Sequence, residues 1–303
     1  MEDAAGGVAI EKPRELGDVR RFSHEAMATV FEVYAVHPDG AYAAQAAQAA
    51  FDLTDRLERE LSRFVPNSDI SRVNRLAAGE STQVTTSTIE CLVIARHMFD
   101  LTGGAFDISI GTGLPSLELN PDDYIVSATK AGVQVDLGGV GKGYAVDLMA
   151  ELLEEWGVQV ALVHGGFSSV LALEPPAGGG WPLTLSDPAA PSRVLSRLSV
   201  RQTALGASGV RKKDHIRDPR TGEPARGRLA AWVALPRPSF VHPVDEGPRV
   251  AATAVADALT TAFMLMSTEE IEALCARTPG LEAWLLPEPS EGTDLLHFEG
   301  PAE

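Results

Sequence analysis

Cysteine is scarce in this sequence, with only Cys91 and Cys275 among 303 residues. Two cysteines so far apart support neither a disulfide framework nor a cysteine-based metal site, and a reducing compartment is the simpler interpretation. Long apolar runs are also missing. The densest stretch, residues 250–266, is interrupted and falls short of the roughly 18 apolar residues that a membrane-spanning helix needs. We therefore expect no membrane span.

Basic residues are few: 25 Lys and Arg stand against 42 Asp and Glu, a formal net charge of −17. This balance disfavours nucleic acid or an anionic membrane as a general partner, so an anionic ligand must be held locally. The amino terminus also lacks the basic and apolar regions of a secretory signal, which predicts a cytoplasmic protein. With 45% hydrophobic residues, the composition is that of a folded globular protein.

Apolar periodicity divides the chain into a disordered lead-in, residues 1–18, and one folded α+β unit, residues 19–303. Spacings of three and four predict helices over 41–64, from a Ser87/Glu90 capping box to Gly103, over 140–156, over 250–266, and from a Ser267/Glu270 capping box. Short β-rich runs predict strands over 29–36, 133–137, 158–163, 169–173, 182–185, 194–200, 229–235, 282–286 and 295–298.

The segment Val135–Asp147 (VDLGGVGKGYAVD) carries a strand through glycines into a helix. Free N–H groups at a helix start, the helix dipole and the charge of Lys142 suit a phosphate group. The glycine spacing matches neither a P-loop nor a dinucleotide-binding fingerprint. A tight turn with an exposed lysine is an equally compatible interpretation.

Asp257 and Thr261 lie four residues apart on one helix face, opposite an apolar face. A carboxylate and a hydroxyl in this arrangement suit Mg²⁺, which prefers oxygen ligands and keeps phosphate oxygens in its shell. A solvated polar face is the alternative. His215, in a polar loop, titrates near neutrality and is a candidate general base, or a solvated loop histidine.

Six segments in order resemble the ApbE family of FAD:protein FMN transferases: AMATVF, LSRFVPNSDISRVN, TGGAFDISIG, VDLGGVGKGYAVD, HIRDPRTGEP and ADALTTA. The resemblance covers about residues 20–298. It implies a single domain with a mixed sheet and helices and with FAD in a cleft, which agrees with the α+β organisation read from the periodicity.

Residue by residue, the resemblance implies an FAD site and a metal site. The FAD contacts it implies are Met27, Phe64, Ala105, Phe106, Asp107, Asp136 and Lys142. The metal ligands it implies are the backbone carbonyl of Gly139 and the side chains of Asp257 and Thr261. Phe64 stands where the family commonly has tyrosine, and Gly139 replaces the usual alanine or serine.

The activity implied by the resemblance is Mg²⁺-dependent transfer of FMN from FAD to a threonine hydroxyl of a target flavoprotein, with release of AMP. His215, or else Asp257, would accept the threonine proton. Two alternatives remain open: Mg²⁺-dependent hydrolysis of FAD to FMN and AMP, and a carrier that binds FAD without chemistry.

Two further departures from the family bear on the cleft. Phe167 follows Gly165 and Gly166 where many relatives have an acidic or amide residue. The chain between Ser208 and His215 is also shorter than in many relatives, which affects the side that would meet a target protein. Many relatives are exported or lipid-anchored, unlike the cytoplasmic location expected here.

Overall fold

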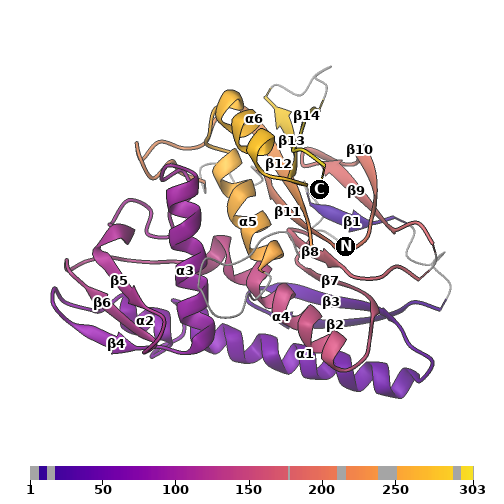
Figure 1. Ribbon diagram of the computed structural model, residues 1–303, viewed down its shortest axis with the longest axis horizontal. Helices are drawn as coiled ribbons and strands as arrows, with labels where there is room; N and C mark the ends of the chain where they lie inside the picture. The colour runs from indigo at the N-terminus through magenta and orange to yellow at the C-terminus, as the bar shows by residue number, and fades with distance from the viewer. Residues whose placement is uncertain are drawn as a thin grey trace.

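The computed structural model describes residues 7–11, 18–176, 178–209, 216–237, 251–288 and 295–302. Its main element is an eight-stranded sheet in the order β14-β13-β12-β11-β8-β7-β3-β2 (Figure 1). Every neighbouring pair in it is antiparallel. The strands are β2 (Arg20–Ala26), β3 (Thr29–Val36), β7 (Val160–Gly165), β8 (Ser169–Ala172), β11 (Thr203–Gly209), β12 (Arg228–Pro236), β13 (Glu282–Pro287) and β14 (Leu296–Glu299).

Two three-stranded sheets accompany the large one among the described residues. The sheet β1-β9-β10 consists of β1 (Val8–Ile10), β9 (Trp181–Asp187) and β10 (Ala190–Val200). The sheet β4-β6-β5 consists of β4 (Ser81–Gln83), β6 (Ile125–Ala128) and β5 (Leu117–Asn120).

Helices cover one face of the large sheet, with α4 and α5 lying against its central strands (Figure 1). The helices are α1 (Gly40–Leu61), α2 (Asp69–Val73), α3 (Thr86–Leu101), α4 (Gly141–Glu155), α5 (Ala252–Phe263) and α6 (Thr268–Arg277), with the 3-10 turns η2 (Leu114–Ser116) and η3 (Leu137–Gly139). The predicted helix starting at Ser267 is confirmed together with its capping box. The α+β expectation is confirmed by this mixture of sheets and helices.

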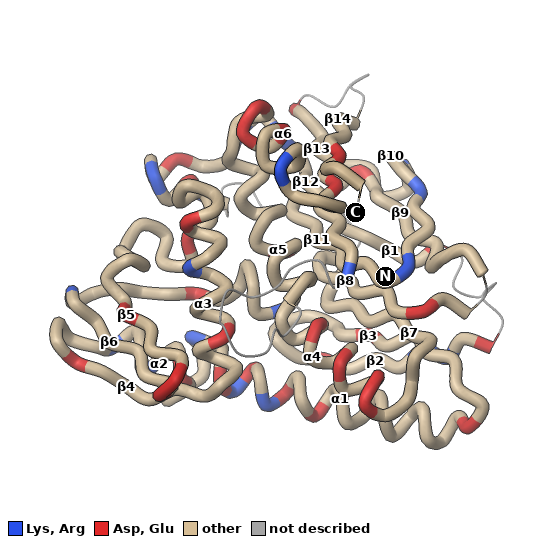
Figure 2. The backbone as a smooth tube through the Cα atoms, viewed as in Figure 1, with Lys and Arg blue, Asp and Glu red and all other residues tan. Residues whose placement is uncertain are grey.

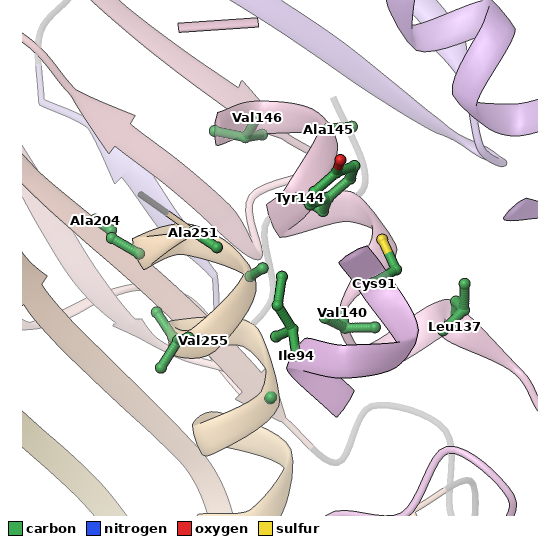
Figure 3. Packing of buried hydrophobic residues seen from close by; sticks show 14 of the residues in the cluster. Cys91, Ile94, Leu137, Val140, Tyr144, Ala145, Val146, Ala204, Ala251 and Val255 are labelled. Carbon is green, nitrogen blue, oxygen red and sulfur yellow. The ribbon is translucent and has the colours of Figure 1, made fainter. Parts of the chain in front are cut away.

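The inner strands of the large sheet, such as β7, β8 and β12, are buried on both faces, which explains their nearly continuous apolar sequences. In β12, Ala231 and Val233 belong to the core beneath the helices, whereas Trp232 belongs to the core beneath the sheet β1-β9-β10. Successive side chains of a strand point to opposite faces, so one apolar run serves two cores. Tyr144 on α4, Cys91 on α3 and Val255 on α5 meet in the core on the helical side (Figure 3).

Two glycines allow α5 to approach its neighbours closely. A Cβ on Gly143 of α4 would lie 2.4 Å from the carbonyl oxygen of Thr253. A Cβ on Gly206 of β11 would lie 2.6 Å from the carbonyl oxygen of Ala256. Both contacts are possible only without a side chain, so these positions seat α5 between α4 and the sheet.

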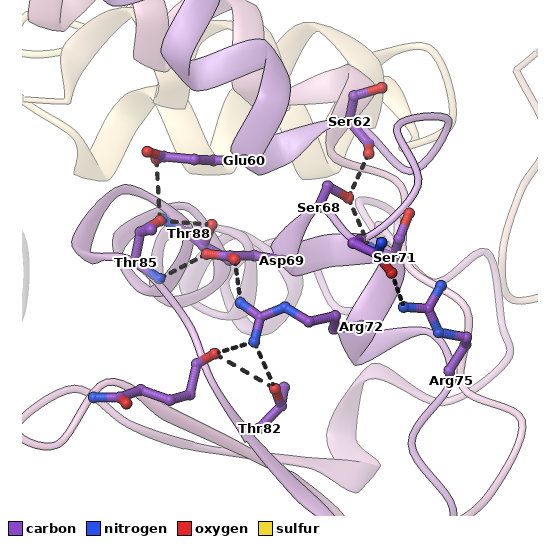
Figure 4. Close-up of polar contacts among 12 residues, drawn as sticks. Glu60, Ser62, Ser68, Asp69, Ser71, Arg72, Arg75, Thr82, Thr85 and Thr88 are labelled. Atoms are coloured by element: carbon purple, nitrogen blue, oxygen red, sulfur yellow. Dashed lines mark hydrogen bonds and ion pairs between the residues drawn. The ribbon is translucent and has the colours of Figure 1, made fainter.

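The sheet β4-β6-β5 is joined to the helices through α2. The Asp69 carboxylate accepts a hydrogen bond from the backbone N–H of Thr85 at 2.6 Å and pairs with Arg72. Arg72 in turn donates to the carbonyl of Gln83 at 2.8 Å (Figure 4). This partly buried network fixes the polar segment that follows α1.

Three local predictions were wrong. The strand predicted over 133–137 is absent, because the Asn74 side chain pairs with the N–H and carbonyl of Val135 in place of a neighbouring strand, and Leu137 begins η3. The helix predicted from Ser87 begins earlier, since Thr85 is the N-cap of α3. The lead-in includes an ordered part, because Val8–Ile10 pair with β9.

Charged residues are dispersed over the molecule. Figure 2 shows acidic positions on α1, α4, α6 and several loops, with lysine and arginine positions scattered between them. No basic stripe of the kind that binds nucleic acid stands out in the part drawn in colour. Among the described residues, none of the helices has the length and apolar character to cross a bilayer.

Candidate functional site

The glycine-rich turn predicted to hold an anion enters α4 through η3. Asp136 precedes it, and its Oδ1 accepts a hydrogen bond from the N–H of Gly138 at 2.9 Å. Its Oδ2 lies 2.9 Å from Nε of Arg63. Lys142, in the first turn of α4, donates through Nζ to the Gly138 carbonyl at 3.0 Å. The turn is therefore fixed by its own side chains, with a lysine held at the start of α4.

The start of α5 is fixed by a buried aspartate of α4. Asp147 accepts hydrogen bonds from the backbone N–H groups of Thr253 and Ala254, both at 3.0 Å. The N-cap residue Ala251 offers no capping side chain, so Asp147 satisfies these helix-start donors from the neighbouring helix. Burial raises the pKa of Asp147 to about 7, against the effect of those hydrogen bonds.

Asp257, further along α5, is buried, and within the described part of the chain only one of its two carboxylate oxygens has a hydrogen-bond partner. Ser169 of β8 donates through Oγ to Asp257 Oδ2 at 2.6 Å. The other oxygen, Oδ1, is buried and has no hydrogen-bond partner among the described residues. Burial raises the pKa of Asp257 to about 6, and the charge of Lys142, the Ser169 hydroxyl and the nearby backbone N–H of Gly143 partly oppose this. The alternative of a solvated polar face is therefore wrong for Asp257.

Thr261 and Gly139 lie beside each other near Asp257. A Cβ built on Gly139 would be 3.7 Å from Thr261 Oγ1 and 3.0 Å from the ring of Phe106. Thr261 Oγ1 is also 3.3 Å from the main-chain oxygen of Asp257. The absent side chain at Gly139 leaves room for the Phe106 ring without affecting the Gly139 carbonyl.

These groups fit a hard divalent cation. A carboxylate oxygen, a hydroxyl and a backbone carbonyl are ligands that Mg²⁺ accepts. A buried carboxylate oxygen without a partner is costly unless something binds it. Asp257 Oδ1 is such an atom, and a bound cation would compensate for its burial.

The segment after α3 contributes a second wall. Ala105 and Phe106 are buried, and the Phe106 N–H donates to Thr102 Oγ1 at 3.0 Å. The Asp107 carboxylate accepts from the N–H of Ser109 at 2.7 Å and from that of Gly111 at 2.9 Å. Asp107 therefore shapes its own loop from within.

A cavity of about 560 Å³ brings most of the predicted residues together. Its lining includes Ala105, Phe106, Asp107, Asp136, Gly139, Lys142, Asp257 and Thr261. These residues come from three segments that are distant in sequence, and the fold brings the three together at one cavity. Two cationic residues, Lys142 and Arg217, are also in its lining.

Two predicted residues are placed elsewhere, and a third is outside the part of the chain that the structure describes. Met27 lines a neighbouring cavity of about 680 Å³ at the tip of the β2–β3 hairpin. Phe64 is 77% exposed and borders neither cavity, with the Arg63 guanidinium 4.6 Å from its ring centre. His215 lies outside the described residues.

Sequence reasoning missed several cavity residues. Ser168 and Ser208 line it, and Ser169 holds Asp257 from behind. Ser208 Oγ also lies 3.0 Å from Thr260 Oγ1. Nothing in the sequence pairs Ser169 with a residue 88 positions away.

Comparison with known proteins gives consistent relatives. The model of the ApbE family matches residues 27–114 and 112–285. The chain is similar to the FAD:protein FMN transferase of Vibrio cholerae, 24% identical over 298 residues, covering 86% of this chain and 84% of that protein. It is likewise 24% identical over 290 residues to the FAD:protein FMN transferase of Klebsiella pneumoniae, covering 81% of this chain and 77% of the relative.

Solved structures share the fold. The flavin transferase ApbE from Vibrio cholerae superposes with a TM-score of 0.77 at 19% identity, covering 93% of this chain and 97% of that one. The apo form of the Pseudomonas stutzeri flavinyl transferase ApbE gives a TM-score of 0.77 at 22% identity, covering 92% and 94%. With the family model matched over most of its length, this chain belongs to the ApbE family.

Proposed function

We propose that the protein transfers FMN from FAD to a threonine hydroxyl of a target flavoprotein, releasing AMP. The observation that carries this is the half-satisfied Asp257 carboxylate, which lines a cavity together with Thr261, Gly139 and Lys142. Family membership and curated relatives named FAD:protein FMN transferase support the same activity.

Asp257, Thr261 and the carbonyl of Gly139 would hold Mg²⁺. When bound, the ion would neutralise pyrophosphate charge and stabilise charge on the departing AMP. The chain's net charge of −17 would otherwise repel that pyrophosphate. Ser169 fixes one oxygen of Asp257, so the orientation of the other is set before any ligand arrives.

Lys142 and the loop after α3 would position the nucleotide. The Lys142 ammonium lies at the start of α4, where free N–H groups and the helix dipole also favour a phosphate group. Ala105, Phe106 and Asp107 form the facing wall of the cavity. Met27 would contact a more distant part of FAD from the adjoining cavity.

The threonine proton requires a base. His215 is the proposed acceptor because an imidazole titrates near neutrality. Asp257 is less suited, since the same oxygen would serve the metal. The Ile216–Pro219 segment, which follows His215 directly, reaches the cavity through Ile216, Arg217 and Pro219.

The test is product analysis with FAD and Mg²⁺, with and without a flavoprotein that carries an acceptor threonine. AMP and FMN are separated by chromatography, and covalent flavin is detected by fluorescence of the denatured acceptor. Asp257→Ala is the loss-of-site variant, and Asp122→Ala, exposed in the turn between β5 and β6, is its matched control. Covalent flavin lost only in Asp257→Ala supports the proposal; AMP with free FMN alone indicates a pyrophosphatase, and tight binding without products indicates a carrier.

A further inference from the structure

The turn between β7 and β8 divides two cavities. Gly166 and Phe167 line both the cavity of about 560 Å³ that contains Asp257 and the one of about 680 Å³ that contains Met27. We call this turn the partition, because it borders both cavities.

The backbone of this partition is strained. Gly166 has φ 60° and Phe167 has φ 58°. A bulky residue is rare in this left-handed region, and such strain persists only where the surrounding structure enforces it. Neighbouring groups must therefore hold Phe167 in place.

The large sheet holds the partition from one side. The His164 ring packs between those of Tyr34 and Phe167, with centroids 5.9 Å and 5.5 Å away. Nε2 of His164 lies 2.8 Å from Glu32 Oε2, which also accepts from the Tyr34 hydroxyl at 2.8 Å. Arg21 donates to the other oxygen of Glu32 at 2.7 Å. This buried network fixes the ring on which Phe167 rests.

The N-terminal strand holds the partition from the other side. The N–H of Val8 donates to the carbonyl of Phe167 at 2.7 Å. A Cβ on Gly7 would lie 2.6 Å from both the Phe167 carbonyl oxygen and its Cβ. Gly7 itself lines the cavity that contains Asp257. The strand β1 precedes residue 27, where the match to the family model begins.

Phe167 is also connected to Asp257 through the two serines that follow it in sequence. Ser168 follows it, and Ser168 Oγ lies 3.2 Å from Ser169 Oγ. Ser169 donates to Asp257 at 2.6 Å. A movement of Phe167 would therefore alter the cavity wall next to Asp257.

We propose that β1 and Phe167 form a shared wall that keeps water from the Asp257 end of the cleft, so that FMN passes to the acceptor hydroxyl and not to water. This rests on the proposed transfer. In both reactions the bond between the FMN phosphorus and the bridging oxygen breaks, and AMP leaves with the electron pair. A new bond forms from phosphorus to the threonine or the water oxygen, whose proton passes to the base. The wall decides which oxygen reaches the phosphorus.

The primary variant is Gly7→Val in the full chain. Its side chain would collide with the Phe167 backbone and separate β1 from the partition. Gly178→Val is the matched control, because a Cβ there has no atom within 4 Å. We expect AMP release from FAD without acceptor to rise about tenfold in Gly7→Val, with more free FMN for each covalent flavin formed. Gly178→Val should behave as wild type.

A second variant, Phe167→Gly, removes the ring while relieving its strained φ, and it replaces Gly7→Val if that variant does not fold. Acrylamide quenching of bound FAD fluorescence provides a readout independent of turnover, and both variants should show increased quenching. If quenching and the ratio of free FMN to covalent flavin stay unchanged in a folded variant, the proposed wall is wrong. It is equally wrong if Gly178→Val shows the increase expected of Gly7→Val. Wild-type protein that binds FAD yet forms neither AMP nor covalent flavin would instead overturn the proposed transfer.

Discussion

Two buried aspartates, one at the α4–α5 crossing and one in the cleft, have similar surroundings but different partners. Asp147 is 3% exposed and Asp257 is 5% exposed, and burial raises the pKa of both. Asp147 receives two backbone N–H groups from α5. Asp257 receives one serine hydroxyl and keeps one oxygen unpartnered among the described residues.

The difference teaches that burial alone does not distinguish a functional carboxylate from a structural one. Both residues would look equally perturbed by their pKa direction. The distinction lies in what remains unsatisfied, because a buried oxygen without a partner is retained only where something else compensates for it. At Asp147 the compensation comes from the fold, and at Asp257 we propose that it comes from a bound ion.

The largest expected effect is that of Asp257→Asn on catalysis. Loss of the negative charge should reduce AMP release by about a thousandfold or more, since a metal site contributes several kcal/mol to such a reaction. Stability should hold or rise, because burial disfavours the charged carboxylate that the substitution removes. Steady-state rates and thermal unfolding of the same preparation measure both. If Asp257→Asn unfolds easily yet turns over normally, Asp257 is a structural carboxylate and not a functional one.

Asp147→Ala should show the opposite pattern. Removing the carboxylate leaves the N–H groups of Thr253 and Ala254 buried without partners. We expect a loss of about 2 to 3 kcal/mol in the free energy of unfolding, with the turnover of the folded fraction within a fewfold of wild type. Urea unfolding followed by circular dichroism gives the first quantity. A catalytic loss without destabilisation would contradict a purely structural role.

The pH dependence of stability tests the raised pKa of Asp147 above the slope that Asp257, with a pKa of about 6, also contributes. The pKa of Asp147 is about 7 when folded and 3.8 as an ordinary aspartate, so the folded state binds the extra proton between these values. Its contribution to stability therefore falls as pH rises from about 4 to about 7, by at most about 1.4 kcal/mol per pH unit. Urea unfolding from pH 5 to pH 8 should show this slope in wild type and a shallower one in Asp147→Ala. Equal slopes would show that other groups produce it.

The smallest expected effect is that of Gly139→Ala. The new methyl group would press on the Phe106 ring at 3.0 Å and should destabilise the fold by about 1 kcal/mol. Binding of Mn²⁺, measured by electron paramagnetic resonance as a probe for the Mg²⁺ site, should change little because the proposed ligand is the backbone carbonyl. A large loss of Mn²⁺ affinity would show that the Phe106 packing sets the carbonyl position.

Strongly periodic helices were predictable from sequence, whereas strands without an apolar signal were not. The stripe along α1 and the capping box at Ser267 gave helices close to those observed. The strand β11 (TALGASG) was missed because small residues replace the expected branched ones. Its Gly206 is required by contact with the backbone of α5. Such a reason appears only in three dimensions.

The candidate site divides in the same way. Asp257 and Thr261 were predictable because an i, i+4 relation is local. The hydrogen bond from Ser169 to Asp257 joins β8 to α5 across the core and leaves no local trace. The role of Asp147 could not be predicted from sequence for the same reason, because its partners Thr253 and Ala254 lie on another helix.

The cavity is lined by residues from nearly the whole chain, which bears on when it forms during folding. Its walls draw on segments from Gly7 to Leu265, so nearly the whole chain must be in place before the cleft exists. Contacts between such distant segments form late, after the loops between them have closed. Nucleotide binding should therefore be among the last properties to appear during refolding, and the rate at which it returns would time the completion of the fold.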